Sequence, residues 1–296
     1  MPKEILHWWL ASAAQQRLPL DRATRQLLEE QQAAYLVGAV LPDTLLHLQG
    51  DGQHALARHL ADRFHDSQTH CYAPLLSFAA KNPPLTPAQQ ACLLGIACHI
   101  ETDIVFHPFV YALSGNDLGR HYRVETDLDL WLLHSNRRPP ELELRELMTE
   151  ETVNAAATVL AGVFDPQTLL PAAIIADALR RHAVIQARYG SIPWQLLARL
   201  LGLLPGTPFH RWQHLFYPVF NWRQGRPVQW PARWNHPTNG NERGDTPQGL
   251  LIEALSRITD LLRAVDEHGL ATALRKQPGE NLLTGLSPSP KQHTPT

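Results

Sequence analysis

The sequence predicts an all-α protein. Alanine, leucine and glutamine are frequent along its 296 residues, and alternating runs rich in valine and isoleucine are almost absent. Apolar residues instead recur at intervals of three and four, the spacing that gathers them on one face of a helix. With 44% hydrophobic and 18% charged residues, the chain can bury a large core, which argues against a disordered or fibrous protein.

Several helix starts carry a capping residue followed by proline. Thr86-Pro87 and Thr246-Pro247 each place a hydroxyl before a proline at the first helical position, and Asp165-Pro166 is similar. Together with the apolar periodicity, these signals divide the chain into a series of helices. The expected helices are 3–16, 21–37, 51–65, 70–80, 87–106, 119–134, 141–163, 167–188, 192–203 and 246–274.

Two segments lack the helical pattern. Prolines and glycines alternate through 205–245, which also holds four of the eight tryptophans, Trp212, Trp222, Trp230 and Trp234. So many aromatic residues predict an ordered loop that either packs on the helical body or forms a rim over a site, where Trp222 and Trp230 could face a lipid. We expect residues 1–275 to form one helical domain and residues 276–296 a disordered tail.

Charge and cysteine content disfavour several classes of protein. The net charge is −2 and no block of five like charges occurs, so sequence-independent nucleic-acid binding is not expected. No apolar run reaches the roughly 18–20 residues of a membrane span, and the start lacks a signal-peptide core. Cys71, Cys92 and Cys98 form no Cys-x-x-Cys pair, which suits free thiols in a core. We therefore expect a soluble, cytoplasmic protein.

Histidine is the unusual component. Ten of the 16 histidines fall within the first 134 residues: His7, His47, His54, His59, His65, His70, His99, His107, His121 and His134. His99 and Asp103 lie four apart in an apolar stretch, and His121 and Glu125 repeat that spacing on the next helix. Residues four apart stand one turn above each other, so each pair can hold one cation. Imidazole and carboxylate are donors that zinc accepts, and two such helices packed together predict a metal-binding cleft.

His107 continues the stripe formed by His99 and Asp103. Because Pro108 disfavours the helical conformation of the residue before it, we expect His107 to lie where this helix ends.

Three further positions are candidates. Asp43 follows a proline where an apolar helix should stop, so it is either an N-cap or a ligand. His7 and His65 could add imidazole ligands. For His65 the alternatives are His54, His59 and His70.

Taken in the order of the sequence, these candidate residues form a pattern that resembles the bacterial zinc-dependent phospholipase C family, which is related to the S1/P1 nucleases. The resemblance rests on His7, the Gly-Ala-Val-Leu-Pro-Asp run 38–43, His65, His99, Asp103, His107, His121 and Glu125. It covers residues 1–134 by motif, and the opening Met-Pro-Lys-Glu-Ile-Leu-His-Trp is similar to the non-secreted bacterial branch. It implies an all-α protein that binds three zinc ions and hydrolyses phosphodiesters.

The resemblance also implies a role for each residue. Asp43, His65 and His99 would hold one zinc ion. Asp103 would bridge it to a second ion that His7 also binds, and the third would be held by His107, His121 and Glu125. Asp43 would also be the base that orients the attacking water. In the secreted enzymes the processed N-terminal residue ligates a zinc, and this chain shows no such processing, so we expect two or three Zn²⁺ ions.

The predicted function is therefore a zinc-dependent phosphodiester hydrolase of the phospholipase C type, acting on a phospholipid or a soluble phosphodiester. One alternative is an S1/P1-like single-strand nuclease, which the near-neutral charge disfavours. A second is an HD-type phosphohydrolase that uses His65 and Asp66. A third is a degenerate, non-catalytic protein that keeps the fold for metal binding or for an interaction.

Overall fold

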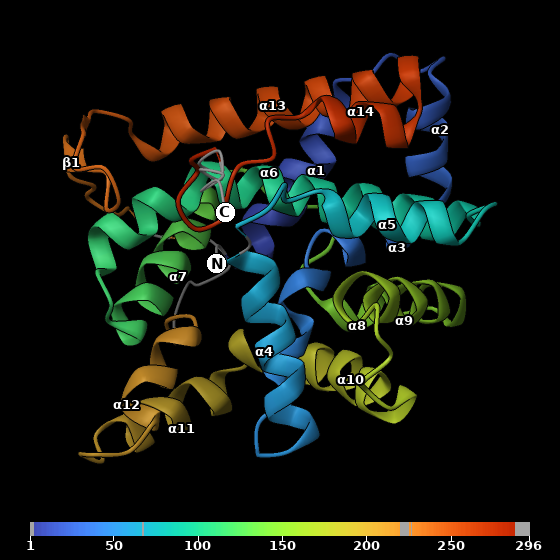
Figure 1. Cartoon of the computed structure of the whole chain (residues 1–296). Helices are drawn as coiled ribbons and strands as arrows, with labels where there is room; N and C mark the ends of the chain where they lie inside the picture. The colour runs from blue at the N-terminus through green and yellow to red at the C-terminus, as the bar shows by residue number, and fades with distance from the viewer. Residues whose placement is uncertain (1–2, 67, 220–224, 226, 288–296) are drawn as a thin grey trace, which may run out of the picture.

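The computed structural model describes residues 3–66, 68–219, 225 and 227–287, and helices dominate them (Figure 1), which confirms the all-α prediction. The helices of the first half are α1 (Glu4–Gln16), α2 (Ala23–Glu30), α3 (Gln32–Gly38), η1 (Leu41–His47), α4 (Gln53–His65), α5 (Ala73–Lys81), α6 (Pro87–Ser114) and α7 (Leu118–His134). Those of the second half are α8 (Leu144–Leu147), α9 (Glu150–Phe164), α10 (Ala172–Tyr189), α11 (Ile192–Gly202), α12 (Phe209–Trp212), η2 (Gln213–Leu215), α13 (Pro247–His268) and α14 (Leu270–Lys276).

Helix α6 is the centre of the fold. It crosses the middle of the molecule in Figure 1 and packs against α1, α3, α7, α9 and α13. Its start is the expected one: the Thr86 hydroxyl accepts from the backbone N–H of Gln89, and the Gln89 side chain accepts from the N–H of Thr86. By length and composition α6 could cross a membrane, which the sequence analysis did not anticipate. Its apolar window is entirely buried within the protein, as in a core helix.

The expectation that this helix ends near His107 is wrong, because α6 continues through Pro108 to Ser114. Proline removes one backbone hydrogen bond, the one that would reach the Ile104 carbonyl. Gly285, with a φ of +62°, packs so close to that carbonyl oxygen that an added Cβ would lie 2.5 Å from it. Complete burial of the flanking Phe106 and Phe109 outweighs the lost bond. His107 therefore stays on the α6 stripe.

Two glycines let α3 and α6 approach each other closely. A Cβ on Gly95 would lie 2.1 Å from the carbonyl oxygen of Tyr35, and one on Gly38 would lie 2.2 Å from that of Cys92. This approach also brings the Ala39 carbonyl to α6, where the Nδ1 of His99 donates to it over 2.9 Å. The glycines therefore set both the helix packing and the orientation of a candidate ligand.

Some expected helices are shorter or divided. The segment 21–37 is interrupted at Gln31, the segment 141–163 becomes α8 and α9, and the helix expected from 167 begins only after Pro171. Proline is well suited to the position before or at a helix start, which accounts for the last difference.

The aromatic segment 205–245 is ordered where it is described. It contains α12, η2 and a short antiparallel pair, β1 (Trp234–Asn235) and β2 (Glu242–Arg243). The rings of Trp230 and Trp234 lie 5.6 and 5.5 Å from that of Phe109 on α6. Trp230 thus packs on the helical body instead of facing a lipid, while Trp222 lies outside the described residues.

The chain after α14 differs from the disordered tail expected from residue 276. Leu282 is fully buried, and Glu280 pairs with Arg257 of α13. The carbonyl of Leu282 also accepts from the Nδ1 of His107 over 2.8 Å. The described part of this segment therefore belongs to the core and helps to orient His107, and residues 288–296 lie outside the described residues.

We expect Gly95→Ala to lower the free energy of unfolding by about 2–3 kcal/mol, because the new methyl group would overlap backbone atoms of α3. Thermal denaturation followed by circular dichroism measures this loss. Gly249→Ala in α13 is the matched control: its nearest atom would be 3.8 Å away, so the melting temperature should not fall. Equal melting temperatures for both variants would contradict the close approach of α3 and α6.

Candidate metal centre

The eight candidate residues converge on one region from five helices. α1 supplies His7, η1 supplies Asp43, and His65 is the last residue of α4; the others are His99, Asp103 and His107 of α6, and His121 and Glu125 of α7. They form three groups, and within each group the donor atoms lie within 4.8 Å of one another. The groups are His7, Asp43 and His99; His65, His99 and Asp103; and His107, His121 and Glu125. His99 belongs to the first two, which therefore form a single cluster.

Asp103 lies at the middle of this cluster. One carboxylate oxygen is 3.5 Å from the Nε2 of His7, and the other is 3.0 Å from the Nε2 of His99 and 3.9 Å from that of His65. The rings of His7 and His99 are stacked with centroids 4.1 Å apart. Asp43 lies 3.4 Å from the Nε2 of His65 and 3.8 Å from that of His99. Asp103 is fully buried, whereas the Asp43 side chain is 16% exposed and marks the side of the cluster that solvent can reach.

Backbone carbonyls orient three of the imidazoles. The Nδ1 of His65 lies 2.8 Å from the carbonyl oxygen of Ala61, and His99 and His107 make equivalent contacts with Ala39 and Leu282. A proton on Nδ1 leaves the lone pair of Nε2 free to bind a metal ion, the usual arrangement of a metal-ligating histidine.

The same three Nε2 atoms and both carboxylate oxygens of Asp103 make no hydrogen bond of good geometry among the described residues, although the Nε2 of His99 lies 3.0 Å from one of these oxygens. Buried polar atoms in this state are costly unless a further group satisfies them. Imidazole nitrogens and carboxylate oxygens are the donors of zinc sites, so the residues present fit a zinc ion.

The third group joins α6 to α7. The Nε2 of His121 lies 2.8 Å from a carboxylate oxygen of Glu125 one turn away, and both residues are buried. The ring centroids of His107 and His121 are 6.2 Å apart. At the start of α7 the Asp117 carboxylate accepts from the backbone N–H of Arg120, which fixes the first turn that carries His121.

The protonation states of three candidate ligands, His7, His107 and Asp43, favour the binding of a cation. Burial lowers the pKa of His107 to about 3, and burial together with the charge of His99 lowers that of His7 to about 3, so both imidazoles are neutral at pH 7. Burial raises the pKa of Asp43, but His99 and His65 outweigh it and bring it to about 2. Neutral imidazole and ionised carboxylate are the forms that ligate a metal.

His99 shows how strongly the carboxylates attract positive charge. Burial lowers the pKa of this imidazole, yet the neighbouring Asp103 and Asp43 overcome that effect and raise it to about 9. A zinc ion at this position would replace the proton and meet the same negative potential.

The three histidines that are alternatives to His65 lie in none of the metal-compatible groups formed by the described residues. His54 contacts the carbonyl of Gln49, His70 contacts that of Gln277, and His59 is exposed. Asp66 of the adjacent His-Asp pair is also exposed and contacts Gln68. Asp66 is in none of the metal-compatible groups formed by the described residues, so the geometry does not favour the HD-type arrangement.

A fourth group that the sequence analysis missed is formed by Glu4, His47 and His182. Glu4 lies 3.5 Å from the Nε2 of His182, whose ring stacks on that of His47 with centroids 4.2 Å apart. The Nδ1 of His182 lies 3.0 Å from the Thr44 hydroxyl. The sequence does contain a signal for two of these residues. Glu4 precedes His7 by three residues and His47 follows Asp43 by four, and residues at these intervals are neighbours on the surface of a helix. His182 comes from α10, and only the tertiary fold brings it here.

Asp129 holds α1 and α7 in register beside the cluster. Its carboxylate accepts from the backbone N–H of Leu6 over 3.0 Å and from the Tyr217 hydroxyl over 2.7 Å. Because Leu6 adjoins His7, this contact fixes the turn of α1 that carries the first candidate ligand.

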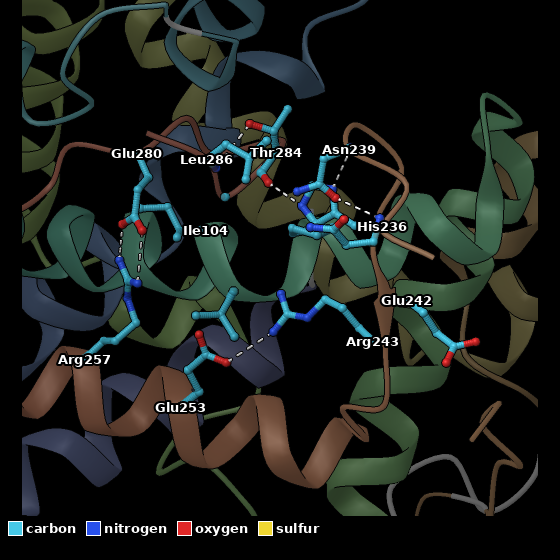
Figure 2. A pocket seen from close by; sticks show the side chains of 14 residues that line it. Ile104, His236, Asn239, Glu242, Arg243, Glu253, Arg257, Glu280, Thr284 and Leu286 are labelled. Atoms are coloured by element: carbon cyan, nitrogen blue, oxygen red, sulfur yellow. Dashed lines mark hydrogen bonds and ion pairs between the residues drawn. The ribbon is translucent and has the colours of Figure 1, made fainter. Parts of the chain in front are cut away.

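A separate cavity of about 390 Å³ lies on another side of α6, where Ile104 and Pro108 form part of its wall (Figure 2). Its arginines are paired: Arg257 with Glu280, and Arg243 with Glu253 at 3.8 Å (Figure 2). Arg257 also binds Glu101, which therefore points away from the candidate ligands. None of the eight candidate residues lines this cavity.

Comparison with known proteins gives one match. A family model described as zinc dependent phospholipase C matches residues 6–162, more than half of the chain and the whole stretch from His7 to Glu125. No curated protein and no solved structure gives a significant match.

We expect zinc to raise the melting temperature of chelator-treated protein, because an ion at a thousandfold its dissociation constant stabilises the folded state by about 4 kcal/mol. Asp103→Ala should lose most of this rise, since the variant lacks the carboxylate at the middle of the cluster. Differential scanning fluorimetry with and without zinc measures the effect.

Asp66→Ala is the matched control, because Asp66 is exposed and lies in none of the groups. It should keep the full zinc-dependent rise. The opposite outcome, with zinc stabilising Asp103→Ala but not Asp66→Ala, would instead support an HD-type site.

Proposed function

The chain belongs to the zinc-dependent phospholipase C family, and we propose that its eight clustered residues hold the zinc ions of a phosphodiester hydrolase that acts on phospholipids. The family assigns the class of reaction: the protein is a zinc-dependent hydrolase of phosphodiesters, of the phospholipase C type. The identity of the ligands, the number of ions and the phospholipid substrate are parts of the proposal.

One observation carries the assignment of ligands. The Nε2 atoms of His7, His65 and His99 and both oxygens of Asp103 are buried without a hydrogen bond of good geometry among the described residues, and all of them belong to the cluster around Asp103. We assign His7, Asp43, His65, His99 and Asp103 to one part of a zinc centre. The group formed by His107, His121 and Glu125 supports one further ion, so the centre would hold two or three Zn²⁺ ions.

Bound zinc supplies a Lewis acid that neutralises phosphate oxygens and lowers the pKa of water toward about 7. The protein's own contribution is orientation and proton transfer. Asp43 is the candidate base, because it combines an ionised carboxylate with partial exposure. From this position it can accept a proton from a water molecule that approaches the phosphodiester.

Two observations support a phospholipid as the substrate, the family and the net charge of the chain. A protein that binds nucleic acid along its backbone usually carries a net positive charge, whereas this chain has a net charge of −2. The near-neutral charge therefore favours a phospholipid over a nucleic acid.

We also propose a cytoplasmic location, which the cysteines support. Cys71, Cys92 and Cys98 are all buried and unpaired. Free thiols are typical of a reducing compartment. Cell fractionation tests this point, and recovery of the protein from the secreted fraction would contradict it.

We expect Asp43→Asn to lower kcat for a chromogenic phosphorylcholine diester by about 10²–10⁴-fold, because the amide cannot accept the proton. Asp66→Asn should retain the activity of the unaltered protein, and a chelator should abolish it. Initial rates, recorded beside the zinc content of each variant, provide the measurement.

Turnover that survives chelation would contradict a zinc mechanism. Faster cleavage of a single-stranded oligonucleotide than of a short-chain phospholipid would favour the nuclease. Zinc-dependent stability without turnover of either substrate would indicate a non-catalytic member of the family.

A further inference from the structure

Helix α11 is oriented with its apolar residues toward solvent. Its buried positions are Gln195 and Gly202, whereas seven large apolar side chains on and just after the helix are exposed, Leu203 most of all at 77%. We call five of them the α11 apolar face: Ile192, Leu196, Leu197, Leu200 and Leu203. A soluble helix ordinarily buries such residues, so this face is suited to contact with another apolar phase.

The orientation of α11 is fixed by its inner side. The amide of Gln195 donates to the carbonyl of Tyr189 over 3.2 Å. Gly202 lies so close to Gln213 that an added Cβ would be 2.5 Å from that side chain. Rolling the helix to bury its leucines would break this hydrogen bond and force bulky side chains into the space beside Gln213.

The apolar face lies in the most basic part of the chain. Residues 178–241 contain eight arginines and no aspartate, glutamate or lysine. Three of the eight are paired with carboxylates at the edges of this stretch, because Asp177 binds Arg180 and Arg181 and Glu242 binds Arg233. Arg199 of α11 is exposed, and so is Arg211 of α12, which packs against α11 at the lower left of Figure 1. The guanidinium of Arg188 lies 4.3 Å from the centre of the Trp194 ring, and that tryptophan is also partly exposed.

We propose that the α11 apolar face docks the protein onto an anionic lipid surface. Exposed leucines can enter the boundary between headgroups and acyl chains, while arginines at the edge bind lipid phosphates. Trp194 has the amphipathic ring that is enriched at membrane interfaces. The combination is that of a helix that lies in the plane of the interface.

Charge argues for lipid over a second copy of the chain. A symmetric dimer through α11 would bring the arginines of one copy close to those of the other, and like-charge contacts oppose association. Anionic headgroups instead complement them. The inference rests on the proposed function in one respect, since a phospholipid hydrolase must reach its substrate at a lipid surface.

Sedimentation with vesicles tests the docking without any turnover. The full chain is mixed, in the presence of chelator, with vesicles of equal parts phosphatidylcholine and phosphatidylglycerol. We expect it to bind these vesicles more strongly than vesicles of phosphatidylcholine alone. Leu196→Gln/Leu200→Gln should lower the ratio of bound to free protein by roughly tenfold or more, because two side chains no longer enter the interface.

Leu20→Gln/Ile252→Gln is the matched control. It replaces two apolar residues that are 71% and 56% exposed on other elements, and it should bind vesicles as the unaltered chain does. Since all four leucine and isoleucine positions are exposed, both variants should keep the melting temperature of the parent.

Three results would overturn the docking. They are absence of binding to the anionic vesicles, equal binding by the two double variants, and a dimer in light scattering that the α11 variant converts to a monomer. The result of the vesicle experiment does not depend on whether the protein hydrolyses phosphodiesters. A protein that binds vesicles but hydrolyses no phosphodiester would retain the docking surface and lose the proposed activity, and the reverse pattern would do the opposite.

Discussion

The ionised carboxylate of Asp103, fully buried at the centre of α6, is the constraint on which the structure depends. An isolated buried charge costs several kcal/mol and is tolerated only when cationic or hydrogen-bonding groups surround it. Here His7, His65 and His99 supply the surrounding groups from α1, α4 and α6. A divalent cation shared by these residues would balance the carboxylate and satisfy their nitrogens at the same time. The helices around α6 can therefore be understood as a support for one electrostatic site.

Several packing contacts orient the side chains of the same site. The close approach of α3 to α6 at Gly38 and Gly95 delivers the carbonyl that orients His99. The chain after α14 delivers the carbonyl that orients His107, and Asp129 fixes the turn beside His7. Three distant parts of the sequence thus contribute backbone or carboxylate oxygens that hold the α1 and α6 imidazoles in place. Such contacts make the geometry of a metal centre part of the stability of the fold.

The sequence predicted the features that depend on the spacing of residues within a helix, and it missed those that depend on tertiary packing. The pairs His99–Asp103 and His121–Glu125 follow from helical spacing, so the sequence predicted the helices that carry them and their side-by-side arrangement in the structure. It failed at Pro108, because burial of the flanking phenylalanines and contact with Gly285 outweigh the local preference of a proline. The group of Glu4, His47 and His182 joins three helices, and sequence spacing points to two of its three members, Glu4 and His47. The outward orientation of α11 has no sequence signal either, since an apolar stripe is ordinarily the buried face of a helix.

The central claim is that zinc lies among these particular side chains, and anomalous diffraction at the zinc absorption edge tests it most directly. In crystals grown with zinc, we expect anomalous peaks at about 2.0–2.2 Å from the Nε2 atoms of His65, His99 and His107 and from the nearest carboxylate oxygens. Data collected below the edge should lack these peaks. Zinc peaks confined to other parts of the protein, with the Asp103 cluster empty at saturating zinc, would contradict the account.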